Sequence, residues 1–256
     1  MTLPVNAFKR ALRDGQSQIG IWNTIPGPVV AELLAGAGFD WVLLDTEHAL
    51  TDIPDIFAML QAVAAYPVSA VVRPQTNDTV LIKRLLDHGA QTLLLPYVQS
   101  AAEAEAAVRA MRYAPRGVRG VSGMTRASRY GAIPDYVQRA EEELCLLVQV
   151  ETAEALAQIE AIAAVDGVDG LFIGPSDLAA SMGHPGNARH PEVVAAIDDA
   201  IRRIVATGKA AGILTLDPAY ARHCLELGTR FTAVGVDMAL LRGAASDLAK
   251  AFGRGA

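Results

Sequence analysis

Short apolar runs alternate along the chain with longer stretches whose apolar residues recur at helical spacing. Most of the short runs are apolar at every position, which is typical of strands buried on both faces of a parallel sheet. These runs predict strands at residues 19–23, 41–45, 69–73, 92–96, 144–150, 170–173, 211–216 and 231–236. Helices are predicted at 28–37, 52–65, 78–87, 152–164, 190–207 and 218–226, and Ser100 with Glu103 forms a capping box that opens another.

Eight strand–helix repeats indicate the α/β class and, within it, a (β/α)8 TIM barrel. We expect one domain over residues 1–256, with an extra N-terminal helix at 6–14 closing the base of the barrel. A doubly wound open sheet is the alternative. Its nucleotide-binding form would have a Gly-rich turn after the first strand, whereas this chain has Thr24-Ile25-Pro26-Gly27-Pro28 and no P-loop.

Composition limits the cellular compartments and the classes of binding partner that we expect for this protein. The chain has 256 residues, a formal charge of −6 and only two cysteines, Cys145 and Cys224, which lack the spacing of a zinc site or a redox pair. Few cysteines indicate a reducing compartment. The first residues lack the apolar segment of a secretory signal, and no run approaches the length of a membrane helix. We therefore expect a cytoplasmic protein that binds neither membrane nor nucleic acid.

Ionisable and amide side chains follow several predicted strands where each strand ends, which is the end that carries the active site in a barrel. Taken singly, each of these side chains has a structural explanation. A carboxylate can cap the next helix, an arginine can form an ion pair, and a histidine can be hydrogen-bonded within the fold. Their convergence on one rim predicts an active site. The residues at these strand ends are Asp45, Glu47, His48, Arg73, Gln149, Glu151 and Asp177.

Glu151 and Asp177 follow neighbouring strands and offer two carboxylates without a nearby cysteine or histidine pair. Such oxygen ligands suit Mg²⁺ or Mn²⁺, whereas zinc favours histidine and cysteine. The alternative is an acid/base carboxylate pair, as in a glycosidase. The basic residues Arg73 and His48 beside them favour an anionic substrate and hence the metal site.

The segment Gly174-Pro175-Ser176 opens a helix after the sixth strand, and its free backbone N–H groups would attract a small carboxylate. Schiff-base chemistry would need a lysine in the barrel mouth. The four lysines, Lys9, Lys83, Lys209 and Lys250, all lie outside the predicted strands. We therefore expect metal-assisted chemistry and no imine.

Five segments, in order along nearly the whole chain, resemble the metal-dependent pyruvate aldolases of the 4-hydroxy-2-oxoheptanedioate aldolase family, in the citrate-lyase-like superfamily. They are Gly20-Ile21-Trp22, Leu44-Asp45-Thr46-Glu47-His48, Val72-Arg73-Pro74, Val148-Gln149-Val150-Glu151-Thr152 and Phe172-Ile173-Gly174-Pro175-Ser176-Asp177-Leu178.

The resemblance implies a role for each matching residue. Glu151 and Asp177 would bind the divalent ion, which would be Mg²⁺, Mn²⁺ or Co²⁺, and His48 would be the base, acting through a metal-bound water. Asp45 and Asp87 would orient His48, and Arg73 would steady the developing enolate oxygen. Gln149, and the turn Gly174-Pro175-Ser176, would contact the substrate.

The implied reaction is reversible cleavage of a 4-hydroxy-2-oxo acid to an aldehyde and pyruvate, or a related oxo acid such as hydroxypyruvate. Two alternatives remain: a CoA-thioester lyase of the same superfamily, and a non-catalytic oxo-acid-binding protein. Relatives are commonly hexamers that exchange the last helix, here 240–252.

The Arg-rich segment 113–131 departs from the family pattern and leaves the natural aldehyde open. We expect this segment to influence aldehyde selectivity or subunit contacts.

Overall fold

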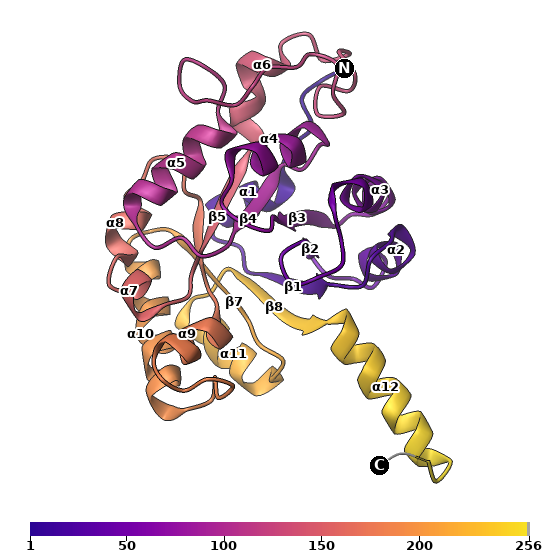
Figure 1. The fold of residues 1–256 in the computed structure, drawn as a ribbon, viewed down its shortest axis with the longest axis vertical. Helices are drawn as coiled ribbons and strands as arrows, with labels where there is room; N and C mark the ends of the chain where they lie inside the picture. The colour runs from indigo at the N-terminus through magenta and orange to yellow at the C-terminus, as the bar shows by residue number, and fades with distance from the viewer. Residues whose placement is uncertain (255–256) are drawn as a thin grey trace.

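A computed structural model describes residues 1–254, and its eight parallel strands close into a barrel in the order β1 to β8 (Figure 1). The strands are Gln18–Asn23 (β1), Trp41–Asp45 (β2), Ser69–Arg73 (β3), Thr92–Leu95 (β4), Cys145–Val150 (β5), Gly170–Ile173 (β6), Ala210–Leu214 (β7) and Phe231–Val236 (β8). Because every strand pairs in parallel with its sequence neighbours, all carboxyl ends meet at one mouth. The predicted barrel is confirmed.

Helices surround the barrel, and several begin where a side chain caps the first turn, as Asp52, Asp78 and Ser100 do. The predicted helix 152–164 is two helices, because Gln158 leaves the helical conformation (φ −106°, ψ 7°). The helix Tyr136–Arg139 (α6) and the 3₁₀ turn Ala140–Glu143 before β5 were not predicted. The others are Pro28–Ala35 (α2), Ile53–Val63 (α3), Thr79–Asp87 (α4), Ala101–Met111 (α5), Ala153–Leu156 (α7), Ile159–Ala163 (α8), Pro175–Ser181 (α9), Pro191–Ala206 (α10) and Pro218–Leu227 (α11).

Aromatic side chains fill the base of the barrel. The N-terminal helix Ala7–Arg13 (α1) buries Phe8 completely, with its ring edge-on to Trp41 and Phe231 at centroid distances of 5.9 Å. Gly20 and Gly212 leave space for these rings, since a Cβ at either position would clash with Trp41 or Phe231. The base is therefore filled by packed side chains.

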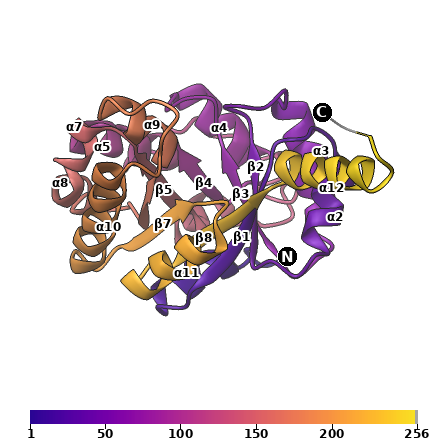
Figure 2. The same ribbon diagram turned by 90° about the horizontal axis from the view of Figure 1, so that it is seen from below.

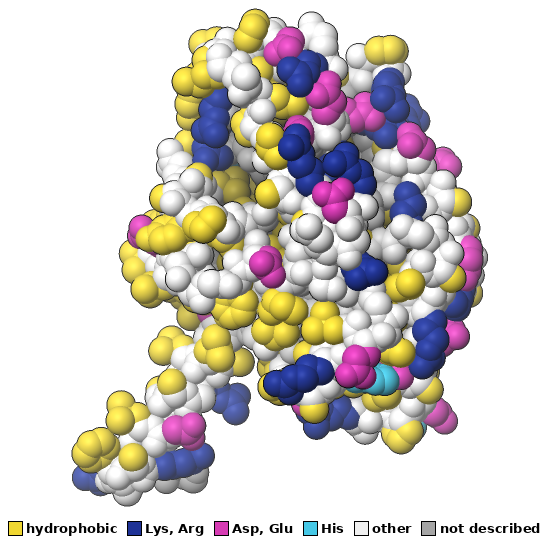
Figure 3. Space-filling model, turned by 180° about the vertical axis from the view of Figure 1, so that it is seen from behind, with side chains coloured by type: hydrophobic (Ala, Val, Ile, Leu, Met, Phe, Trp, Pro, Cys, Tyr) yellow, Lys and Arg dark blue, Asp and Glu magenta, His cyan; other side chains and the backbone are white. Residues whose placement is uncertain are grey.

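The last helix, Asp237–Ala251 (α12), leaves β8 and projects away from the barrel (Figures 1 and 2). Apolar side chains line its length (Figure 3) and are exposed in the protomer, among them Leu240, Leu241 and Leu248. The buried Asp237 fixes its base, because that carboxylate accepts hydrogen bonds from the backbone N–H groups of Thr24 and Ile25 and from two side chains of the same segment. The body of α12 thus presents unpaired apolar surface.

Over residues 1–254, none of the helices is both long enough and apolar enough to cross a membrane.

Candidate active site

The end of β2 and the end of β3 meet in a buried ion pair. Asp45 and Arg73 are register partners in the two strands, so their side chains leave the barrel side by side. Arg73 Nε and Nη2 donate to Asp45 Oδ1 and Oδ2 at 2.8 and 2.7 Å, a two-point contact that fixes the guanidinium plane. Trp22 Nε1 donates to Asp45 Oδ2 at 3.3 Å, and the Trp22 ring lies 5.0 Å from the guanidinium carbon. Arg73 is therefore held on two sides before any substrate binds.

The remaining nitrogen of Arg73 contacts two other groups of the mouth. Arg73 Nη1 lies 2.7 Å from Glu47 Oε2 and donates to Gln149 Oε1 at 3.3 Å. Although burial disfavours its charged form, the hydrogen bonds and charge of Asp45 raise the pKa of Arg73 above its ordinary value. The guanidinium is thus a permanent cation at the centre of the mouth.

Glu47 belongs to this network although the sequence analysis gave it no role. Its backbone N–H donates to Asp45 Oδ1 at 3.0 Å, and its Oε2 lies 2.7 Å from Arg73 Nη1 and 3.8 Å from His48 Nε2. Burial raises the pKa of Glu47, while the charges of Arg73 and His48 oppose that shift. Its position between two candidate residues in the sequence was the available signal.

Glu151 is oriented by two donors. Gln149 Nε2 donates to Glu151 Oε2 at 2.8 Å, and the backbone N–H of Tyr97 donates to Oε1 at 2.8 Å. Tyr97 has a left-handed backbone (φ 55°), an uncommon conformation for a residue with a side chain. Gly174 leaves room for the carboxylate, because a Cβ there would clash with Glu151.

The mouth holds more negative charge than Arg73 alone balances. The pKa of Glu151 is raised to about 7, chiefly by burial; the charges of Asp177 and Glu47 add to this shift, and the Tyr97 N–H and Arg73 oppose it. Asp177 also raises the pKa of Glu47. Ser176 and Asp177 lie in the first turn of α9 and are exposed at the rim. These carboxylate oxygens, whose ionised form is disfavoured by burial and by mutual repulsion, fit a hard divalent cation.

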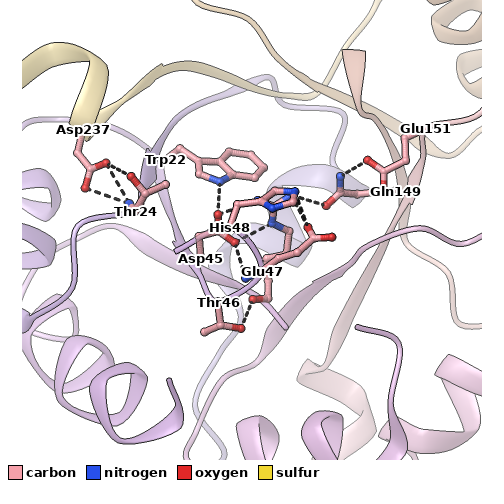
Figure 4. A network of polar contacts seen from close by, with 10 residues as sticks. Trp22, Thr24, Asp45, Thr46, Glu47, His48, Gln149, Glu151 and Asp237 are labelled. Atoms are coloured by element: carbon pink, nitrogen blue, oxygen red, sulfur yellow. Dashed lines mark hydrogen bonds and ion pairs between the residues drawn. The ribbon is translucent and has the colours of Figure 1, made fainter. Parts of the chain in front are cut away.

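His48 lies at the rim with its side chain 67% exposed, and its Nε2 is 3.8 Å from Glu47 Oε2 (Figure 4). The oxygens of Asp45 are occupied by Arg73, Trp22 and the Glu47 N–H. Asp45 therefore contacts the Glu47 backbone and Arg73, and its hydrogen bonds do not include the His48 ring.

The protomer does not bring Asp87, which the sequence analysis expected to orient His48, together with that histidine. Asp87 ends α4, the helix that returns the chain to the start of β4 at the base, whereas His48 follows the end of β2 at the mouth. Asp87 Oδ1 instead accepts from Arg119 Nη2 at 2.7 Å. Arg119 is fully buried, with its guanidinium 4.5 Å from the ring centroid of Tyr113.

Other arginines of the 113–131 segment are also partnered within the protomer. Arg116 Nη1 lies 2.9 Å from Glu141 Oε2, and Arg126 donates to the backbone carbonyls of Leu60 and His88. These contacts satisfy much of the positive charge that is evident in the segment's sequence.

Comparison with known proteins assigns the chain to a family. The family model described as HpcH/HpaI aldolase/citrate lyase matches residues 18–244. The chain is 62% identical to a pyruvate aldolase of Rhizobium etli, over 98% of this chain and 99% of the relative. It is 58% identical to a hydroxypyruvate/pyruvate aldolase of Pseudomonas aeruginosa, over 100% and 96% of the two chains. A crystal structure of an HpcH/HpaI aldolase/citrate lyase family protein from Burkholderia cenocepacia superposes with a TM-score of 0.92 at 41% identity, covering 96% of this chain and 99% of that one. The resemblance found in the sequence is thereby confirmed, and the chain belongs to the HpcH/HpaI aldolase/citrate lyase family.

Proposed function

We propose that the protein catalyses the reversible aldol cleavage of 4-hydroxy-2-oxo acids to an aldehyde and pyruvate, or the related oxo acid hydroxypyruvate. The names of the two similar proteins, a pyruvate aldolase and a hydroxypyruvate/pyruvate aldolase, support this reaction. The observation that carries it is the fixed guanidinium of Arg73 among the carboxylates of the mouth.

A divalent cation fits the carboxylates, and we propose that Glu151 and Asp177 bind Mg²⁺, Mn²⁺ or Co²⁺. Burial of Glu151 near other carboxylates supports this assignment, because a cation would offset the desolvation and the repulsion that disfavour its ionised form. When bound, such an ion supplies a Lewis acid that polarises the substrate's oxo group. Gln149 and Tyr97 hold Glu151 in place for it.

Arg73 stabilises the charge that develops during cleavage. As the C3–C4 bond breaks, its electron pair moves onto C3 and is delocalised to the oxo oxygen as an enolate. Because Asp45 and Trp22 already hold the guanidinium, little reorganisation accompanies this step. The enolate is then protonated at C3 and pyruvate leaves.

His48 accepts the proton of the 4-hydroxyl group, which allows the aldehyde carbonyl to form. Its exposure at the rim gives it access to the substrate and to solvent, and Glu47 lies beside it. Asp45 is a positioning residue for this histidine through the Glu47 backbone N–H. We assign the substrate carboxylate to Gln149 and to the turn Gly174, Pro175 and Ser176, where free N–H groups open α9.

The test is pyruvate release from 4-hydroxy-2-oxo acids, coupled to a pyruvate-consuming reporter. The expected result is turnover that disappears on chelation and returns with Mg²⁺, Mn²⁺ or Co²⁺. Turnover of malyl-CoA in place of the oxo acid would identify the CoA-thioester lyase. Binding of pyruvate without turnover of either substrate would identify a non-catalytic oxo-acid-binding protein.

We further propose a cytoplasmic homohexamer in which α12 packs on a neighbouring copy. The exposed apolar side chains along α12 support this assembly, since they are unpaired in the protomer. Light scattering of the full chain, compared with a chain ending before residue 238, measures the assembly. A hexameric mass in both would contradict the role given to α12.

A further inference from the structure

A second group of metal-binding side chains lies outside the active site, between α9 and the first turn of α10. His184, His190 and Glu192 place their ligand atoms within 4.8 Å of one another. His184 Nε2 is 2.8 Å from Glu192 Oε2, and His190 Nδ1 is 3.9 Å from the same oxygen. The two imidazole rings are stacked, with centroids 3.5 Å apart and planes inclined by 14°.

The backbone brings these side chains together through two successive turns. The Asn187 N–H donates to the His184 carbonyl, and the His190 N–H donates to the Asn187 carbonyl, both at 3.0 Å. Gly183 and Gly186 have φ values of 85° and 76°, which glycine adopts without steric cost. Formation of the cluster therefore needs no change of backbone.

The ring of His190 presents its Nδ1 atom to the first turn of α10. Its Nδ1 accepts a long hydrogen bond, 3.4 Å, from the Glu192 N–H at the start of α10. A metal binds the deprotonated nitrogen of an imidazole, and Nδ1 is the His190 nitrogen that faces Glu192. The long distance makes this bond easy to exchange for a metal contact.

We propose that His184, His190 and Glu192 form a second cation site, selective for a borderline transition ion such as Zn²⁺. Two imidazole nitrogens and one carboxylate suit zinc, unlike the oxygen ligands of Glu151 and Asp177. Ligand atoms of a tetrahedral zinc site lie about 3.4 Å apart, because each is about 2.0–2.1 Å from the ion. The observed nitrogen–oxygen separations of 2.8 and 3.9 Å bracket that value.

A bound ion would connect the turn after α9 to the first turn of α10. The His184 and His190 side chains are 23% and 32% exposed, so the ion can enter from solvent and keep a water ligand. Since α9 carries Asp177, this link would brace the helix beside the active site from its far end.

The test is a Zn²⁺ titration of the full chain by calorimetry, with excess Mg²⁺ to occupy oxygen-ligand sites. The wild type is expected to bind one more Zn²⁺ per chain than His184→Ala, or to bind it at least ~10-fold more tightly, since loss of even an outer-shell partner of a ligand costs ~10–100-fold in affinity. Glu192→Gln should weaken binding similarly. His223→Ala is the matched control, because this imidazole pairs with Asp198 on the other side of α10 and should leave zinc binding unchanged.

Anomalous diffraction at the zinc edge places the ion. A peak between His184, His190 and Glu192 supports the site. Equal zinc stoichiometry and affinity in wild type and both variants, or a peak only elsewhere, overturns it. Circular dichroism of the metal-free variants shows that they are folded. No readout depends on aldolase turnover, so failure of this site and failure of the proposed function are distinguishable.

Discussion

The buried carboxyl of Glu151 predicts that divalent-ion binding at the active site strengthens as pH rises through neutrality. Burial and the charges of Asp177 and Glu47 set the pKa of Glu151 at about 7. A proton and a cation compete for the same oxygens. With that pKa, roughly 9% of chains carry an ionised Glu151 at pH 6 and roughly 91% at pH 8, so the apparent affinity for Mn²⁺ should rise ~10-fold between them.

Calorimetric titration with Mn²⁺ from pH 5.5 to 8.5 measures this slope. Glu151→Gln removes the titrating group and should bind Mn²⁺ weakly with little pH dependence. His48→Gln removes the nearby imidazole and should keep the wild-type slope, which would assign the slope to Glu151. Equal Mn²⁺ affinity at pH 6 and pH 8 in the wild type would refute the assignment, as would an unchanged slope in Glu151→Gln.

The same pKa has a consequence for stability in the absence of metal. Because the folded-state pKa lies above the unfolded value of 4.5, the unfolded chain releases this proton first, and stability falls as pH rises from about 4.5 to about 7. The loss is on the order of 3 kcal/mol. Added Mg²⁺ should therefore raise the melting temperature more at pH 8 than at pH 6.

Three further predictions concern the mouth. Arg73→Ala should lower turnover ~10²–10³-fold. By removing the cation that pairs with buried Asp45, it should also lower the free energy of unfolding in urea by ~3–5 kcal/mol. Arg73→Lys should rescue only part of the turnover, and full rescue would contradict a role for the planar guanidinium. His48→Ala should slow aldol cleavage more than oxaloacetate decarboxylation, which needs no hydroxyl deprotonation, whereas Arg73→Ala should slow both; equal losses would mean that His48 is not the base. Borohydride with pyruvate should add no mass, and a pyruvyl adduct on any lysine would overturn the enolate mechanism.

The sequence predicted the barrel and its polar mouth because both follow from local pattern. Strands buried on two faces are apolar at every position, and a parallel barrel brings all their carboxyl ends together. Asp45 and Arg73 were therefore found as strand-end residues. Their pairing through one register position, and the inclusion of Glu47, depend on side-chain directions that a linear pattern does not contain.

The local charge of a sequence segment was the least reliable guide to which side chains remain available for function. The 113–131 segment carries arginines without acids, yet its cations find Asp87, Glu141 and Asp166 from elsewhere in the chain. Asp87 itself was assigned by resemblance, and the direction of α4 places it at the base. Six positions separate His184 from His190, and two turns were needed to bring them into contact.

The carboxylate of Asp237 connects the start of α12 to the segment at the end of β1 through hydrogen bonds. Four hydrogen-bond donors of residues 23–25 converge on it from the barrel side. In the proposed hexamer, α12 would already be helical and oriented before a neighbouring copy covers it, so little conformational entropy would be lost on assembly. The segment that Asp237 holds begins one residue after Trp22, and Trp22 contacts both Asp45 and Arg73. A displacement of α12 would therefore act on the same segment that positions Trp22 beside the Arg73 guanidinium.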